Sequence, residues 1–237
     1  MTNYIRIKKM LYVVSLASIA IVLGLMEIPW FIPSGPFAGF LKLDFSEVII
    51  LMSVLILGPK ETIGVILLRS FTRRVAFGFS EFDIIGEIIA IFASLSIVLA
   101  YILSKRITGN KERPLIYEVS INNNHVSRKE WVVTTGLVIL TLSLAMIIIN
   151  YFITTPAYLS LMGVSQSGWW IFSFHPTVFS FVPDAGRFAL FGYDIQFTFL
   201  NFLWFVVISY TPFNITKGLL VSILFLLIKP RMKYLEL

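Results

Sequence analysis

The stretch VVTTGLVILTLSLAMIII (residues 132–149) decides the fold class, because it contains no charged side chain. An apolar run of this length can cross the hydrocarbon core of a membrane as an α-helix. Transmembrane β-strands would alternate apolar and polar residues over about ten positions, and this stretch does not alternate. It therefore predicts a membrane-spanning helix.

The composition of the whole chain has the same apolar character. Of its 237 residues, 57% are hydrophobic and only 14% are charged, and the mean hydropathy is +0.87. A soluble domain of this size needs more charged surface. We therefore expect an all-α polytopic membrane protein in which residues 1–237 form a single transmembrane domain.

Six apolar segments are expected to form a compact bundle of transmembrane helices. Their predicted ranges are about 10–26, 45–57, 61–71, 84–103, 131–152 and 212–228. Gly58-Pro59 ends the second, because proline cannot donate to a helix and disfavours helical geometry in the residue before it. The basic head and apolar run at the N-terminus also fit a signal peptide, but the later spans favour a first transmembrane helix.

Two segments between the spans stand out. The hydrophilic stretch at about 104–130 is expected to be a cytoplasmic loop. The aromatic-rich stretch at about 157–210 is expected to be an outer insertion, since aromatic rings favour the membrane–water interface. An apolar piece at 197–210 has the character of a seventh span, but the break at Thr211-Pro212 and the charge count favour assigning it to the insertion.

The basic residues predict an orientation. With six spans, 13 of the 19 Lys and Arg residues fall on the side that holds both termini. Because basic residues accumulate in cytoplasmic loops, both termini are expected in the cytoplasm. The others lie on the outer side or within spans, where a charge is costly unless it is paired or functional. They are Lys42, Arg69, Arg73, Arg74, Arg187 and Lys217.

Several kinds of chemistry are missing from the sequence. The chain has no P-loop, no HExxH motif and no cysteine, and its two histidines, His125 and His175, lie outside the predicted spans. These absences argue against an ATPase, a metal centre and a thiol or histidine-based enzyme. The positive net charge is explained by the cytoplasmic loops, so no nucleic-acid partner is expected.

Polar residues gather at the ends of three spans that the predicted topology brings to the outer side. Asn214 and Lys217 are three residues apart and share a helix face. Their donors and acceptors, beside apolar walls, suit a ligand with imide or carbonyl edges. The alternative is that Asn caps a helix and Lys reaches the interface. The candidate binding residues are Leu41, Lys42, Asp44, Asn150, Tyr151, Asn214 and Lys217.

Asp44 has a second interpretation. Together with Ser46 and Glu47 it forms a suitable N-terminus for the second helix, where negative charge is favoured. This local role explains Asp44 better than ligand contact does. Lys42 and the backbone near Leu41 are then the parts of this stretch expected to bind.

Four motifs carry a family resemblance. They are FLKLDFSEV (40–48), LGPKE (57–61), NYFITTPAY (150–158) and PFNITKGLLVSILFLLIKP (212–230). In this order they resemble the substrate-binding S components of energy-coupling factor (ECF) transporters, in particular those of the riboflavin type. The resemblance covers most of the chain.

The resemblance implies a vitamin-binding subunit in the cell membrane of a prokaryote. One riboflavin, or a related flavin such as its mononucleotide (FMN), would bind near the outer face, under the loop after the first helix. A separate transmembrane coupling subunit and two ATPase subunits would supply the energy, and no cofactor is expected. Asn150, Asn214 and Lys217 would hydrogen-bond the polar edge of the flavin.

The third span departs from the family pattern, in which a Glu and a Lys-Asn pair are common. Here GVILLRSFTRR (64–74) has Ile66 and Arg69-Ser70 at these positions. Arg69, Arg73 and Arg74 could favour an anionic flavin such as FMN, or they could pair with Glu81 or Asp83. An S component for another small vitamin, and a structural or assembly membrane protein, remain alternatives.

The first helix is expected to contact the coupling subunit. Close packing of membrane helices uses small residues, and S components commonly carry an alanine-based version. The candidates here are Ser15, Ala17, Ala20 and Gly24.

Overall fold

The structure is a computed structural model that describes residues 2–30, 41–109, 114–117, 126–161, 187–190, 193–196 and 199–234. Its α-helices are α1 (Thr2–Leu25), α2 (Ser46–Ile56), α3 (Pro59–Phe77), α4 (Glu81–Thr108), α5 (Arg128–Ile149), α6 (Thr155–Leu161) and α7 (Phe199–Ile228). Shorter turns are η1 (Leu115–Tyr117), the π-helical η2 (Asn150–Thr154) and η3 (Lys229–Tyr234). The strands β1 (Ile28–Pro29) and β2 (Lys42–Leu43) pair antiparallel, as do β3 (Arg187–Leu190) and β4 (Tyr193–Gln196).

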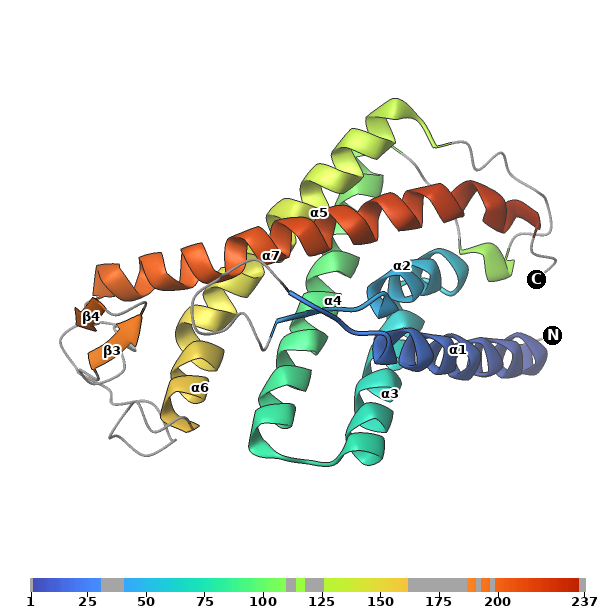
Figure 1. The fold of residues 1–237 in the computed structure, drawn as a ribbon. Helices are drawn as coiled ribbons and strands as arrows, with labels where there is room; N and C mark the ends of the chain where they lie inside the picture. Colours follow the sequence, from blue (N-terminus) through green and yellow to red (C-terminus); the bar gives the residue numbers. More distant parts are fainter. Residues whose placement is uncertain are drawn as a thin grey trace.

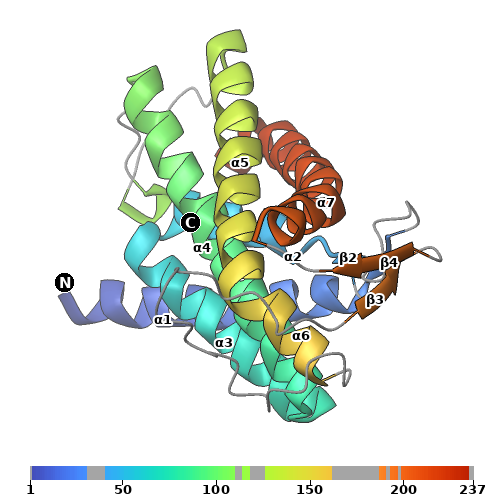
Figure 2. The same cartoon turned by 90° about the vertical axis from the view of Figure 1, so that its left-hand side faces the viewer.

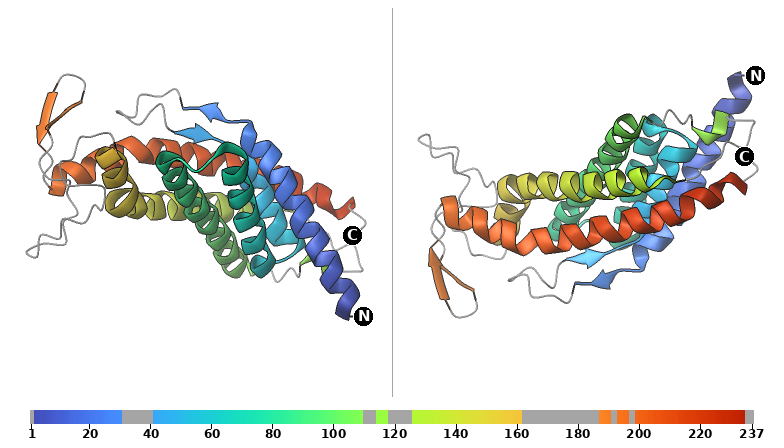
Figure 3. Two further views of the ribbon diagram at one scale, coloured as in Figure 1. Left: turned by 90° about the horizontal axis from the view of Figure 1, so that it is seen from below. Right: turned by 90° about the horizontal axis from the view of Figure 1, so that it is seen from above.

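The predicted all-α bundle is confirmed. Because η2 joins α5 to α6 without interruption, the described residues contain six main helical segments (Figure 1). Four are long and apolar enough to cross a membrane: Asn3–Leu25, Glu81–Thr108, Arg128–Tyr158 and Leu200–Met232. α2 is shorter, and α3 carries more charge. The start of α1 and the end of α7 lie at the same end of the bundle (Figures 1 and 3).

The predicted break at Thr211-Pro212 is wrong, because α7 runs through Pro212. Pro212 cannot donate a backbone hydrogen bond, but membrane helices tolerate proline where packing and neighbouring groups compensate. The residues on both sides supply that packing, since Val206, Tyr210 and Phe213 are all buried. Residues 199–210 therefore belong to the last span. The rest of the predicted insertion contains α6 and the β3–β4 hairpin, and residues 162–186 lie outside the described part.

Most helices also extend beyond their predicted ends. α1 begins at Thr2 rather than near residue 10, and α3 continues to Phe77 rather than residue 71. The apolar run marks only the part of a helix that lies in hydrocarbon, whereas backbone hydrogen bonding continues into polar flanks. Local signals set the real ends of α4: Ser80 Oγ accepts from Asp83 N at 3.2 Å, and Gly109 ends the helix at φ 72°.

The described residues form three clusters of buried apolar side chains. α1 packs against α2 and α3, while α4, α5 and α7 pack together with other residues of α2 (Figure 2). The third cluster joins η2 and α6 to the first half of α7. Gly218 lets α7 approach α5 closely, because a Cβ there would lie 3.2 Å from Ile139 Cα. Directly after the end of α7, buried Lys229 forms an ion pair with Glu130 of α5. These contacts hold the second half of α7 against α5, and α7 also packs against η2 beside the candidate site.

Candidate functional site

One cavity of about 470 Å³ lies between the middle of α7, the ends of α1, α3 and α5 with η2 and α6, the first half of α4, and strand β2. It is lined by six of the seven predicted binding residues. These are Leu41, Lys42, Asp44, Asn150, Asn214 and Lys217. Arg73 and Arg74, which were considered above as contacts of an anionic flavin, also line it. The remaining lining residues were not predicted as ligand contacts: Glu27, Phe82, Asp83, Gly86, Glu87, Ile89, Ala90, Ala93, Met146, Tyr158, Tyr210 and Phe213.

Two buried amides form one wall of the cavity. Asn150 lies in the π-helical turn η2, where Thr154 Oγ1 donates to its side-chain oxygen. π-helical turns inside α-helices occur often at functional sites. Asn214 lies inside α7, so it is not the helix cap that was its alternative interpretation. Its Nδ2 is buried without a hydrogen-bond partner in the described structure, which leaves a donor for a ligand.

Lys217 stands one turn further along α7 and faces two carboxylates. Its Nζ lies 3.8 Å from Asp44 Oδ2 and 3.7 Å from Glu47 Oε1. Only 8% of the surface of the Lys217 side chain is exposed. The ammonium is therefore held in place at the cavity wall instead of reaching the interface, and its charge is balanced before any ligand binds.

Asp44 serves both the helix and the cavity. Its Oδ1 accepts from the backbone N of Ser46 at 3.0 Å and from the Ser46 hydroxyl. The predicted local role at the start of α2 is therefore confirmed. Burial alone would raise the pKa of Asp44, but nearby Lys217 and Arg69 and the Ser46 hydroxyl hold that pKa below its usual value.

A fully buried ion pair lies behind this wall. Arg69 of α3 donates to Ser46 Oγ at 2.8 Å and to Ser94 Oγ at 3.2 Å, and it lies 3.5 Å from Glu47 Oε1. Ser94 in turn donates to Glu47 at 2.9 Å. Arg69 does not line the cavity, so its contacts are structural. They join α2, α3 and α4.

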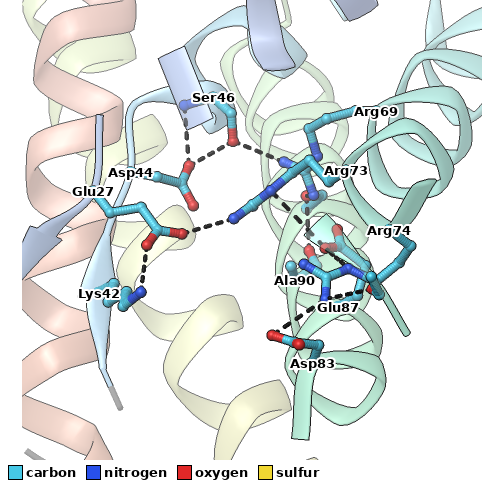
Figure 4. Close-up of polar contacts among 12 residues, drawn as sticks. Glu27, Lys42, Asp44, Ser46, Arg69, Arg73, Arg74, Asp83, Glu87 and Ala90 are labelled. Atoms are coloured by element: carbon cyan, nitrogen blue, oxygen red, sulfur yellow. Dashed lines mark hydrogen bonds and ion pairs between the residues drawn. The ribbon is translucent and has the colours of Figure 1, made fainter. Parts of the chain in front are cut away.

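Arg73 and Arg74 line the opposite wall, and both are paired (Figure 4). Arg73 Nη2 lies 2.7 Å from Glu27 Oε1, and Glu27 also accepts from Lys42. Arg74 lies 3.3 Å from both Asp83 Oδ1 and Glu87 Oε2. The prediction that these arginines pair with a carboxylate of the next helix is confirmed for Asp83. The other carboxylates paired with them are Glu87 and Glu27, not Glu81. Asp83 and Glu87 are four residues apart and so share a helix face, and this spacing could have indicated that both carboxylates meet the arginines.

Aromatic side chains complete the cavity. Phe82 of α4 and Tyr158 of α6 stack with their ring centres 6.0 Å apart, and Phe213 packs edge-on against Trp30 of the β1–β2 hairpin. Tyr151 does not line the cavity, because its ring packs against Phe202, 5.2 Å away. The motif NYFITTPAY thus supplies Asn150 and Tyr158 to the lining, and ligand contact by Tyr151 stays a prediction.

The small residues of α1 divide between two faces. Ala17 and Ala20 are buried in the packing of α1 against α2 and α3. A Cβ at Gly24 would lie 3.6 Å from Ser46 Cβ, so Gly24 also faces the chain itself. Ser15 is exposed. Of the four residues predicted for a coupling-subunit interface, Ser15 is the one available to a partner in this conformation.

The described residues contain no group of three His, Cys, Asp or Glu side chains arranged to hold a metal ion. His125 and His175 lie outside the described part of the chain. The cavity offers amide, ammonium, carboxylate and aromatic groups. This set can bind a planar, polar-edged organic ligand.

Comparisons with known proteins identify a family model and relatives that match this chain. The family model for the substrate-specific component of ECF transporters matches residues 8–229. The riboflavin transporter RibU of Streptococcus thermophilus is 25% identical over 95% of this chain and 83% of its own length. The riboflavin transporter FmnP of Bacillus subtilis is 26% identical over 96% of this chain and 93% of its own.

The fold also matches a solved structure. The S component of a bacterial ECF transporter superimposes with a TM-score of 0.54 and 24% sequence identity, covering 96% of both chains. At this identity the match supports the fold only.

Proposed function

Because the chain belongs to the family of substrate-specific components of ECF transporters, we propose that it binds riboflavin, or a related flavin such as FMN, for uptake into the cell. Membership makes the chain a multi-pass membrane transport component and not an enzyme. It also replaces the alternative of a structural or assembly protein. The two similar proteins named above are riboflavin transporters, which supports a flavin ligand here.

The observation that carries the proposal is the wall made by Asn150, Asn214 and Lys217. All three side chains are buried, and all three line the same cavity. The polar edge of a flavin presents two carbonyls and one N–H, which match an ammonium and amides that both donate and accept. The volume of about 470 Å³ lies within the range of small-molecule sites.

The family and the distribution of charge also support a proposal for how uptake is driven and how the chain is oriented in the membrane. The chain has no P-loop, so two separate ATPase subunits and a transmembrane coupling subunit would drive uptake. The excess of Lys and Arg in the loops on the side of the termini supports cytoplasmic termini. The site then lies toward the outer face of a prokaryotic cell membrane, where it can collect the vitamin.

Asn214→Ala tests the site. It removes a buried donor that has no partner within the described chain, so the loss falls on the ligand contact. We expect flavin affinity to drop by about 1–3 kcal/mol, roughly 5- to 150-fold, measured by quenching of flavin fluorescence in purified protein. Asn3→Ala, an exposed amide at the start of α1, is the control. Unchanged affinity in Asn214→Ala would remove this residue from the site.

Ser15→Trp tests the partner interface separately from binding. Ser15 is exposed on α1, and an indole there would obstruct a closely packed helix. We expect normal flavin affinity but loss of flavin uptake in cells that contain the ATPase and coupling subunits. Ala20→Trp is not a useful partner experiment, since Ala20 is buried inside the chain. Normal flavin uptake by Ser15→Trp would show that the face of α1 carrying Ser15 does not contact the coupling subunit.

A different small vitamin remains the second candidate ligand. It is favoured by the departure of α3 from the family pattern, with Ile66 and Arg69-Ser70 where a Glu and a Lys-Asn pair are common. Competition of unlabelled vitamins against bound flavin separates the two, because a tighter competitor would identify the true ligand.

A further inference from the structure

The cavity as a whole is lined by as many carboxylates as cations. Four cations line the whole cavity, and four carboxylates line it with them. The cations are Lys42, Arg73, Arg74 and Lys217, and the carboxylates are Glu27, Asp44, Asp83 and Glu87. A cavity built for a phosphate ester would carry an excess of unpaired positive charge. This balance instead suits a ligand without net charge.

Glu87 is the carboxylate that lies close to both arginines of α3. Its Oε2 lies 3.3 Å from Arg74 Nε and 4.0 Å from Arg73 Nε, so one carboxylate serves two consecutive guanidinium groups. Glu27 and Asp83 hold the outer ends of the same two arginines, at 2.7 and 3.3 Å (Figure 4). The Nε atoms of both arginines make no hydrogen bond in the described structure, but both lie within 4.0 Å of Glu87 Oε2. A phosphate that approached them would therefore sit beside a carboxylate of like charge.

The second oxygen of Glu87 is free to meet a ligand. Oε1 is buried and has no hydrogen-bond partner in the described structure, although the side chain lines the cavity. A buried acceptor without a partner is costly, so a donor from the ligand would satisfy it. The neighbouring Gly86 and Ala90 are small and also line the cavity, which leaves room for a chain of hydroxyl groups along α4.

We propose that Glu87 is a specificity-determining residue that accepts a hydrogen bond from a hydroxyl of an uncharged polyol chain and, by occupying Arg73 and Arg74, disfavours a phosphorylated one. The inference rests on the proposed flavin-binding function. Within that function it selects riboflavin over FMN. Arg73 and Arg74 then fix the positions of the carboxylates around them through ion pairs and do not bind an anionic ligand.

The experiment compares the dissociation constants of riboflavin and FMN in purified protein, by fluorescence quenching. Wild type is expected to bind riboflavin at least about tenfold more tightly than FMN. In Glu87→Gln the size is kept and the charge is removed, so the ratio of the two constants is expected to fall by about tenfold. Glu81→Gln removes an exposed carboxylate of the same helix outside the cavity and is expected to leave the ratio unchanged.

A second variant keeps the proposal testable if the Glu87→Gln protein does not fold. Asp83→Asn removes a half-exposed carboxylate that also holds Arg74, and it should lower the same ratio by a smaller factor, about threefold. If wild type binds neither flavin, the proposed function itself fails. If wild type binds riboflavin but the ratio stays constant in both variants, or wild type prefers FMN, the role of Glu87 is overturned while flavin binding stands.

Discussion

Arg69→Met is expected to lower the free energy of unfolding by about 3–5 kcal/mol, because it leaves a buried carboxylate with too little positive charge around it. Arg69 and Glu47 are both fully buried. Without the guanidinium, Glu47 keeps the Ser94 hydroxyl, and the cation that remains within 4 Å of it in the described structure is Lys217, 3.7 Å away, which Asp44 also shares. Ser46 and Ser94 also lose a donor each.

Thermal unfolding in detergent measures this effect. A loss of this size corresponds to a midpoint lower by about 6–20 °C for a chain of this length. Arg106→Met, at an exposed position near the end of α4, is the control and should shift the midpoint little. The double variant Arg69→Met with Glu47→Met removes both charges and should recover more than half of the loss. A single variant as stable as wild type would show that the pair does not join these helices.

Lys217→Met is expected to weaken flavin binding by about 10- to 100-fold, the scale of a lost hydrogen bond to a charged group. Methionine keeps much of the length of the side chain but removes the ammonium at the cavity wall. Asp44, which lines the cavity 3.8 Å from Nζ, would then face carbonyl oxygens of the flavin without the ammonium, and Glu47 behind it would lose a cation 3.7 Å away. Direct contact and electrostatic balance are therefore lost together.

Fluorescence quenching by purified variants gives the affinity, and elution volume in detergent shows whether the fold is kept. Lys60→Met, an exposed lysine at the start of α3, removes a comparable charge far from any contact with the cavity lining. Wild-type affinity in a correctly folded Lys217→Met protein would mean that the flavin lies elsewhere.

The sequence predicts the class of fold because long apolar runs have one stable solution in a membrane. It fails where tertiary contacts override a local signal. Pro212 has the properties of a helix end, yet buried neighbours on both sides keep α7 continuous. Ala17 and Ala20 have the properties of an intermolecular contact, yet small residues serve packing within a chain equally well.

The candidate site was predictable in part for the same reason. Asn150, Asn214 and Lys217 were assigned to the outer ends of their spans, and the cavity does bring them together, although Asn214 and Lys217 lie in the middle of α7 and not at its start. The pairing of Arg69 with Glu47 joins residues 22 positions apart, and nothing in either local stretch identifies the partner. Glu27 and Glu87 were missed because each looks like an ordinary polar residue near a helix end, until the packing of α1, α3 and α4 brings it against an arginine.

Titration of purified, detergent-solubilised wild-type protein with riboflavin tests the central claim most directly. The account predicts saturable quenching of flavin fluorescence at one flavin per chain, and a yellow colour that copurifies from cells supplied with riboflavin. A folded, colourless protein that leaves the fluorescence of riboflavin and FMN unchanged over the accessible concentration range would contradict it.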